Sequence, residues 1–150
     1  MTTTGAGESA LSDEQQQQMR RAVPDAMLQT PYVGWLGPVF EHFGPDEVVM
    51  RLPFRHELTN DGARYHGGVV AALMDTTAAA AAWSNHDFSK GTRASTVSMS
   101  VQYVGAADRS DLLCRARVVR RGRELTFVDI TVTDTADKLL AHGLQTYRIV

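Results

Sequence analysis

The residues best suited to chemistry lie between Asn60 and Gly68 and at Asp75, a short distance further along the chain. Gly67 and Gly68 stand where a helix is predicted to begin. Glycines there leave the first backbone amides uncovered at the positive end of the helix dipole, which can bind an anion or an oxyanion. Asp75 falls within an otherwise apolar helix, where an ionised carboxylate is costly to bury without a partner or a path to solvent. Together these features predict a functional site that combines an acid with an oxyanion-binding amide.

The spacing of His66 and Asp75 bears on the assembly of this site. Nine residues on one helix separate two side chains by roughly 13 Å and by about half a turn in azimuth. One chain therefore cannot bring both residues to one small substrate. A two-fold dimer would bring the His66 end of one chain to Asp75 of the other, and it would do so twice. The spacing predicts a homodimer with shared active sites.

Two helices are predicted. One runs from about Gly67 to Ser84, where apolar residues recur at helical spacing and cover nearly the whole circumference, as in a buried helix. The other is a short surface helix that begins at Ser12. Pro24 and then Pro31 are expected to end this helix, because proline lacks the amide donor and clashes with the preceding turn.

The rest of the sequence predicts strands, separated by segments of turn composition. They are expected at residues 35–43, 47–52, 92–103, 112–120, 125–133 and 139–149. An irregular loop at residues 53–65 leads into the buried helix. Short links between consecutive strands predict an antiparallel meander. The order of strands, one helix and more strands predicts an α+β fold whose antiparallel sheet curves round that helix.

Length and composition narrow the class of protein. The 150 residues suit one domain, expected at 11–150 after a disordered leader at 1–10. The net charge of −2 lacks the basic excess of nucleic-acid binders. Cys114 is the one cysteine and cannot form an internal disulfide, and no stretch has the length and apolarity of a membrane span or a secretory signal. We expect a cytoplasmic protein that binds neither nucleic acid nor membrane.

The pattern of Asn60, His66-Gly67-Gly68 and Asp75, followed by the strand from Thr96 to Tyr103, resembles hot-dog thioesterases of the phenylacetate-pathway (PaaI-like) type. The resemblance extends from about residue 29 to residue 149. It implies the hot-dog fold, in which an antiparallel sheet of five to six strands wraps round one long helix. It also implies an acyl-CoA substrate, a homodimer that often pairs into a tetramer, and no metal or cofactor.

The resemblance assigns roles to four of these residues. It makes Asp75 the nucleophile or the general base that activates water. It makes the amide of Gly67 the donor that polarises the thioester carbonyl. Asn60 matches the asparagine that helps to hold the carbonyl or the attacking water, and His66 matches the histidine that orients the thioester and Gly67.

Three further residues complete the predicted site. Thr96 matches a Ser or Thr that positions water from the partner's strand. Ser95 and Ser98 are close enough that a register slip of one residue would exchange the faces of this strand. Gly68 and Tyr65 are expected to contact the substrate.

Other interpretations remain open. A hydratase or dehydratase of the same fold would place a histidine and an acid differently, and this sequence lacks that pattern. A non-catalytic module that binds an acyl thioester has no need of Asp75 and Asn60 together. Serine-hydrolase and metalloenzyme motifs such as Gly-x-Ser-x-Gly and His-Glu-x-x-His do not occur.

Several reactive or charged residues are predicted to be structural. Cys114 lies on a strand and is expected in the core. The other histidines have no ligand spacing: His42, His56, His86 and His142. An arginine-rich hairpin could hold the phosphates of CoA, although a solvated sheet exterior is favoured. Its members are Arg115, Arg117, Arg120, Arg121 and Arg123.

Overall fold

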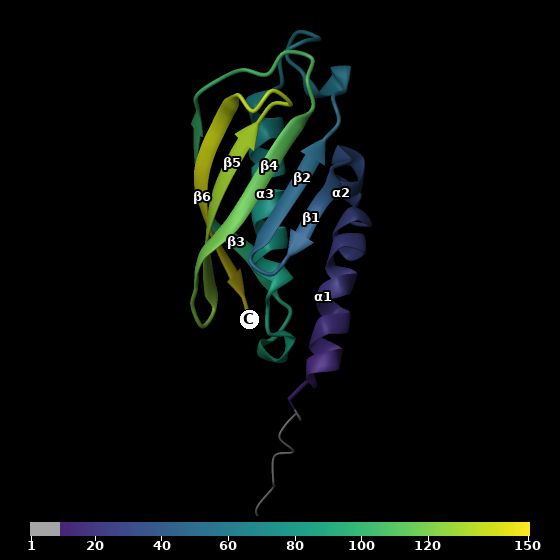
Figure 1. Cartoon of the computed structure of the whole chain (residues 1–150), viewed down its shortest axis with the longest axis vertical. Coiled ribbons are helices and arrows are strands. Elements are labelled where there is room, and N and C mark those ends of the chain that lie inside the picture. The colour runs from purple at the N-terminus through teal and green to yellow at the C-terminus, as the bar shows by residue number, and fades with distance from the viewer. Residues whose placement is uncertain (1–9) are drawn as a thin grey trace, which may run out of the picture.

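The computed structural model describes residues 10–150, so the predicted leader lies outside the described residues apart from Ala10. Its central element is α3 (Gly67–Ser84), and a six-stranded antiparallel sheet curves round this helix (Figure 1). The strands are β1 (Val39–Gly44), β2 (Glu47–Leu52), β3 (Ala94–Tyr103), β4 (Leu112–Arg121), β5 (Leu125–Thr133) and β6 (Leu139–Ile149). The predicted architecture of one helix wrapped by an antiparallel sheet is confirmed.

The helix α3 is buried because it is apolar on nearly every side. Leu73, Met74 and Ala78 have no exposed surface, and the small alanines of its second half let β2, β4 and β5 approach closely. Arg121 closes the C-terminal end of α3, where its guanidinium donates to the carbonyl of Ala82 at 2.9 Å. A cation is favourable there because the last carbonyls of a helix lack hydrogen-bond donors and carry the negative end of the dipole.

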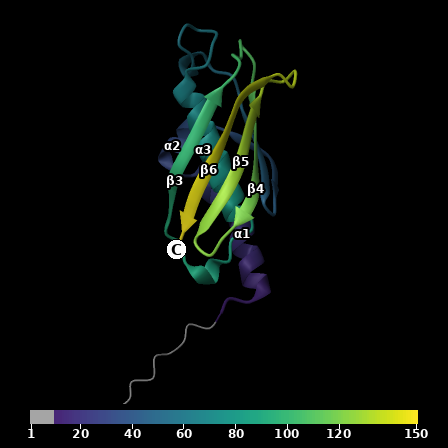
Figure 2. The same cartoon turned by 90° about the vertical axis from the view of Figure 1, so that its left-hand side faces the viewer.

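The position of β3 corrects the predicted meander. β4, β5 and β6 follow one another as expected, but β3 pairs with β6, while β2 occupies the other side of β4. The link from β3 to β4 is too long for a tight hairpin, and Asp108 within it forms a bridge with Arg64 in the loop before α3. This link crosses the end of the sheet in Figure 1. β3 is therefore an edge strand, as Figure 2 shows beside β6.

The N-terminal helix is longer than predicted. α1 (Asp13–Leu28) has Ser12 as its N-cap, as expected, and the hydroxyl of Ser12 accepts a hydrogen bond from the amide of Gln15. It continues through Pro24, where the sequence predicted an end. Val23 is buried on one side of Pro24, and the next turn packs its side chains on the main core. This burial outweighs the loss of one helical hydrogen bond at proline.

A short helix replaces the first part of one predicted strand. Pro31 begins α2 (Pro31–Leu36), the position at which proline costs a helix no hydrogen bond. The strand predicted at residues 35–43 therefore starts only at Val39. Leu36 anchors α2 because its side chain is fully buried, whereas Trp35 remains more than half exposed.

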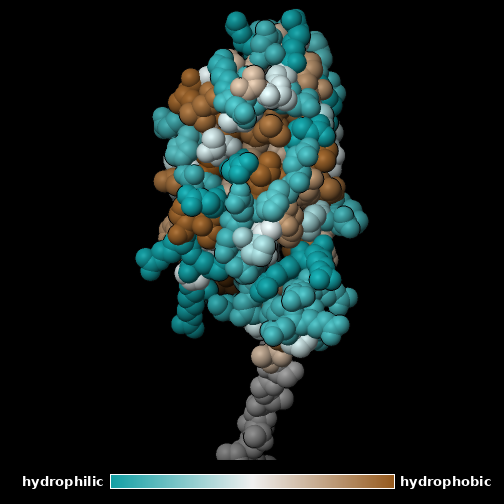
Figure 3. Space-filling model, viewed as in Figure 1, coloured by the Kyte–Doolittle hydropathy of each residue, from teal (hydrophilic) through white to brown (hydrophobic). Residues whose placement is uncertain are grey.

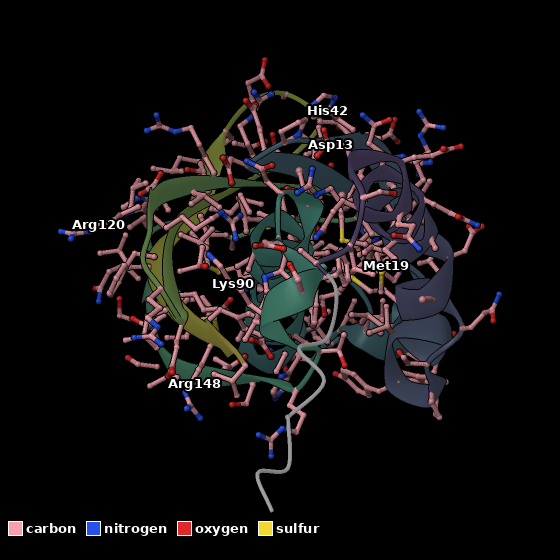
Figure 4. All side chains as sticks on the ribbon, turned by 90° about the horizontal axis from the view of Figure 1, so that it is seen from below. Asp13, Met19, His42, Lys90, Arg120 and Arg148 are labelled. Carbon is pink, nitrogen blue, oxygen red and sulfur yellow. The ribbon has the colours of Figure 1, made fainter. Side chains whose placement is uncertain are left out.

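On the face seen in Figure 3 the surface is mostly hydrophilic, with separate hydrophobic patches. Arg120 and Arg148 project away from the body when the molecule is seen from below (Figure 4). Of the arginines in the hairpin of β4 and β5, Arg115 on β4 forms an ion pair with Glu47 on the neighbouring strand β2 at 2.9 Å. No helix in residues 10–150 is long and apolar enough to cross a membrane.

Candidate active site

The carboxylate of Asp75 is held from one side only. Its Oδ1 accepts a hydrogen bond from the hydroxyl of Thr96 at 2.6 Å and another from the side-chain amide of Gln145. Its Oδ2 has no hydrogen bond with any residue in the described part of the chain. Two donors on one oxygen fix the orientation of the carboxylate. The second oxygen remains available to water or to a substrate.

A β-bulge turns Thr96 toward Asp75. The pairing of β3 with β6 shifts register between Thr96 and Ser98, so Val97 is an extra residue in β3 and is 55% exposed. Without the bulge, strict alternation would place Thr96 on the face opposite Met99, which packs on the core. Bulges commonly re-aim a side chain in this way. Thr96, rather than Ser95 or Ser98, therefore contacts the acid.

The other half of the predicted site lies where α3 begins. His66 is the N-cap, and its Nδ1 accepts a hydrogen bond from the amide of Gly68 at 2.8 Å. The amides of Val69 and Val70 bond to the carbonyl of His66. The amide of Gly67 alone in this first turn forms no hydrogen bond within residues 10–150. It is thus the amide that can polarise a carbonyl oxygen at the positive end of the helix.

The cap also determines which ring nitrogen of a neutral His66 carries the proton. Because Nδ1 accepts a hydrogen bond, a neutral ring carries its proton on Nε2, which can donate to a bound group. A Cβ added to Gly68 would lie 2.8 Å from Nδ1, so a side chain here would break the cap. The amide of Gly68 already donates to His66 and is not free to bind substrate. A contact between Gly68 and substrate stays a prediction, and it would have to use another part of the residue.

Tyr103 supports the same helix start from β3. Its hydroxyl donates to the carbonyl of Gly67 at 2.9 Å, and its ring lies about 3.5 Å from the position a Cβ of Gly67 would take. The sequence showed Tyr103 only as one residue of an alternating strand. Its contact with Gly67 requires the long-range pairing of β3 with β6, which the sequence pattern did not predict.

Asn60 sits in the turn that precedes α3. Its backbone amide bonds to the carbonyl of Arg64, and its side chain is exposed without a partner in the described residues. Asp61 closes this turn by accepting from the amides of Arg64 and Ala63, and these hydrogen bonds hold the pKa of its carboxyl below the ordinary value. The predicted turn is confirmed, and it presents Asn60 near the His66 end of α3.

Tyr65 lines a pocket of about 240 Å³ beside Gly67. Its ring packs edge-on against Phe54 at 5.7 Å, and its hydroxyl is buried with no hydrogen-bond partner in the described chain. Burial raises the pKa of this phenol. The ring can contact a ligand in the pocket, but the hydroxyl is enclosed, so substrate binding by Tyr65 stays a prediction that rests on the ring.

The chain thus divides the predicted residues into two groups. Asp75 and Thr96 lie together midway along α3, whereas Asn60, His66 and Gly67 lie at its N-terminal end. Within residues 10–150 no three His, Cys, Asp or Glu side chains gather as a metal site would require.

Gln145 is a site residue that sequence reasoning missed. It is 1% exposed and donates to both the carboxylate and the backbone carbonyl of Asp75. The signal was present in the sequence, because Gln145 is a polar residue in line with the inward-facing Gly143 and Tyr147 of an alternating strand.

Comparison with known proteins gives a consistent result. Residues 63–141 match the family described as Thioesterase superfamily. A Halobacterium salinarum protein named as an esterase is 32% identical over 108 residues, which cover 70% of this chain and 71% of the relative. Human acyl-coenzyme A thioesterase 13 is 29% identical over 104 residues, covering 68% and 72%. The PaaI protein of the E. coli phenylacetic acid degradation operon shares the fold, with a TM-score of 0.76 over 90% of this chain and 93% of PaaI at 18% identity.

Proposed function

Because this chain belongs to the thioesterase superfamily, we propose that it hydrolyses an acyl-CoA thioester to a free acid and CoA. The observation that carries the proposal is the pair of uncommitted groups on α3: Oδ2 of Asp75 and the amide of Gly67. A carboxylate and an oxyanion-stabilising donor are the two groups that acyl transfer to water requires. Human thioesterase 13, a relative over most of this chain, is named for the same reaction.

The chemistry follows from these groups. The thioester carbonyl oxygen accepts a hydrogen bond from the amide of Gly67, and the bond strengthens as negative charge develops on that oxygen. In a general-base route, Asp75 takes a proton from water as the water oxygen attacks the carbonyl carbon. The C–S bond then breaks, and the proton passes to the departing thiolate of CoA. In a nucleophilic route, the Asp75 carboxylate attacks the carbonyl carbon, the C–S bond breaks to release the thiolate of CoA, and a mixed anhydride forms. Water then hydrolyses this anhydride, which restores the Asp75 carboxylate and releases the acid, and a proton from that water passes to the thiolate.

We propose further that each active site is shared by two chains. Asp75 lies eight positions after Gly67 on α3, which corresponds to roughly 12 Å along the helix axis. No single thioester carbon can lie within reach of both groups in one chain. A homodimer, which could pair further into a tetramer, would combine Gly67 of one chain with Asp75 of the partner subunit.

The edge strand β3 suits such a dimer. Thr96, near one end of β3, contacts Asp75, and Tyr103, at the other end, contacts Gly67. If β3 pairs antiparallel with its own copy about a two-fold axis, the Tyr103 end of one chain lies beside the Thr96 end of the other. Both ends therefore meet at each site. Unpaired edges are normally covered, and Val97 and Tyr103 are each more than half exposed on this one.

The test is release of CoA thiol from a panel of acyl-CoA substrates by the parent and by Asp75→Asn. Loss of general-base catalysis lowers turnover by roughly a hundredfold or more, and we expect KM to change far less. Asp129→Asn is the matched control, because Asp129 is also a hydrogen-bonded carboxylate but pairs with His142 away from the site. Binding of acyl-CoA without thiol release would indicate a binding module, and an Asp75→Asn variant as active as the parent would refute the mechanism.

A further inference from the structure

We propose that Tyr103 is a positioning residue for the His66 end of the site, and that it acts on the histidine ring through one peptide group at the start of α3. The inference rests on the proposed function and adds a residue to the machinery of that site. The peptide group is the one that joins Gly67 to Gly68. Its carbonyl accepts a hydrogen bond from the hydroxyl of Tyr103 at 2.9 Å, and its amide donates to Nδ1 of His66 at 2.8 Å.

The hydrogen bonds of this chain all run in one direction. The phenol donates to the carbonyl of Gly67, the amide of Gly68 donates to Nδ1, and Nε2 of a neutral His66 is left to donate to a bound group. Because the carbonyl and the N–H of a peptide share one resonance system, a donor on the oxygen makes the N–H a stronger donor. Aligned hydrogen bonds strengthen one another by roughly 10–30% per bond. The hydroxyl of Tyr103 therefore strengthens the cap on His66 and, through the ring, the donor at Nε2.

The peptide group takes this extra hydrogen bond without loss to the helix. In an α-helix the carbonyl of Gly67 also accepts from the amide four residues further on, and a carbonyl oxygen has two lone pairs. The ring of Tyr103 adds van der Waals contact, since it lies about 3.5 Å from the position that a Cβ of Gly67 would take. The first peptide of α3 is thus held by the helix, by Tyr103 and by His66.

The end of β3 that carries Tyr103 is itself fixed. Tyr103 pairs with Ala141 of β6. Just beyond the strand, the amides of Val104 and Gly105 both donate to the carbonyl of Leu140, at 2.9 and 3.1 Å. The phenol therefore projects from an anchored backbone, as a group that positions another residue must.

The assignment gives β3 a positioning hydroxyl at each end. Thr96 holds Asp75 at one end, and Tyr103 acts on His66 at the other. These are the two ends that antiparallel pairing of β3 would bring together in the proposed dimer. Tyr103 is 54% exposed in the single chain, and a partner strand would shield its hydrogen bond from water and so strengthen it.

Kinetics of Tyr103→Phe test the role of the hydroxyl, because this variant keeps the ring. The probes are acetyl-CoA, hexanoyl-CoA and phenylacetyl-CoA, at a protein concentration where sedimentation shows parent and variant in the same oligomeric state. For each probe that the parent hydrolyses, kcat should fall by about threefold to tenfold while KM changes by less than about twofold. The loss should be similar for all of them, because the hydroxyl acts on a donor and not on the acyl group. Tyr103→Leu also removes the ring and should cost at least as much.

Ser100→Ala is the matched control. It removes a hydroxyl of the same strand that forms no hydrogen bond within residues 10–150. Ser100 lies between Met99 and Val101, which pack on the core, so alternation points its side chain away from α3. The control should keep the parental kcat and KM.

NMR reads the chain of hydrogen bonds without turnover. At about pH 8, where a histidine ring is normally neutral, Nδ1 of His66 should give the signal of an unprotonated acceptor and Nε2 that of a protonated nitrogen. Tyr103→Phe should move the amide proton of Gly68 upfield and speed its exchange with solvent, because the hydrogen bond to Nδ1 weakens. Ser100→Ala should leave the signals of Gly68 and His66 unchanged.

Three results would overturn this inference alone. They are a parental kcat in Tyr103→Phe, a raised KM with unchanged kcat in that variant, and unchanged Gly68 and His66 signals in its spectrum. The second would mean that the phenol contacts substrate directly. Absence of thiol release by the parent from every thioester would overturn the proposed function and this inference with it.

Discussion

Complementation between two inactive variants tests the shared site most directly. His66→Ala removes the side chain that caps the Gly67 end of α3, and Asp75→Asn removes the charge at its middle. Each variant alone should be inactive, because every site in its homodimer lacks one group. In a mixed dimer, one site combines the intact His66 of one chain with the intact Asp75 of the other. The second site carries both substitutions.

The expected recovery follows from counting sites. Random exchange of equal amounts gives homodimers and heterodimers in the ratio of about 1:2:1, so about half of all dimers are mixed. Each mixed dimer has one intact site of two, and the mixture should therefore reach about a quarter of the parental activity per chain. If each chain held a complete site, every chain in the mixture would be defective and no activity would return.

A second mixture controls for exchange. A chain that carries both substitutions is mixed with an equal amount of parent. With shared sites every heterodimer is inactive, so activity should fall to about half of its value before exchange. With a site inside each chain, the parent would keep its full activity. Exchange is verified by affinity capture of differently tagged chains. Captured mixed dimers without thiol release in the first mixture would refute the shared site.

Three further predictions concern buried groups. Gln145→Leu should lower kcat by about tenfold with little change in KM, because Gln145 positions Asp75 through its carboxylate and its backbone carbonyl and does not itself contact substrate in the proposed mechanism. Burial raises the pKa of Cys114 to about 12, so Ellman's reagent should modify this thiol only after denaturation, and thiol release by the native enzyme should report CoA alone. His86 is buried, and desolvation lowers its pKa below 6.5, so its proton binds more tightly in the unfolded chain. Stability should therefore fall as pH falls below about 6.5, and urea midpoints at about pH 7.5 and pH 5.5 should differ less for His86→Gln than for the parent.

The sequence predicts most of the secondary structure because local patterns determine it. The period of 3.6 residues marks α3, and alternation marks the last three strands, whose observed bounds agree with the predicted ones to within a residue. The helix through Pro24 is different. Its continuation depends on Val23 and the next turn packing against α3 and the core, and such tertiary contacts have no signature within the segment itself.

The site was predictable where it depends on local sequence and not where it depends on register. His66, Gly67 and Gly68 form their cap within three residues, so their arrangement is visible in the sequence. The contact between Thr96 and Asp75 depends on one extra residue, Val97, in the pairing of β3 with β6. An alternating pattern does not reveal a bulge, so the pattern alone could not predict which face of the strand Thr96 occupies. The family resemblance pointed to Thr96, and the structure shows its contact with Asp75.

The division of the site along α3 has a physical reason. The amide of Gly67 is useful only if no group of its own chain occupies it, and an acid within the first turn would be drawn to it as a helix cap. Asp75 lies more than two turns further along, where Thr96 and Gln145 hold it instead. Distance keeps the acid from occupying the free amide at the start of its own helix. Under the proposed mechanism, the same distance keeps Asp75 from a carbonyl bound at Gly67 of its own chain, and a partner chain would bring an acid to that amide.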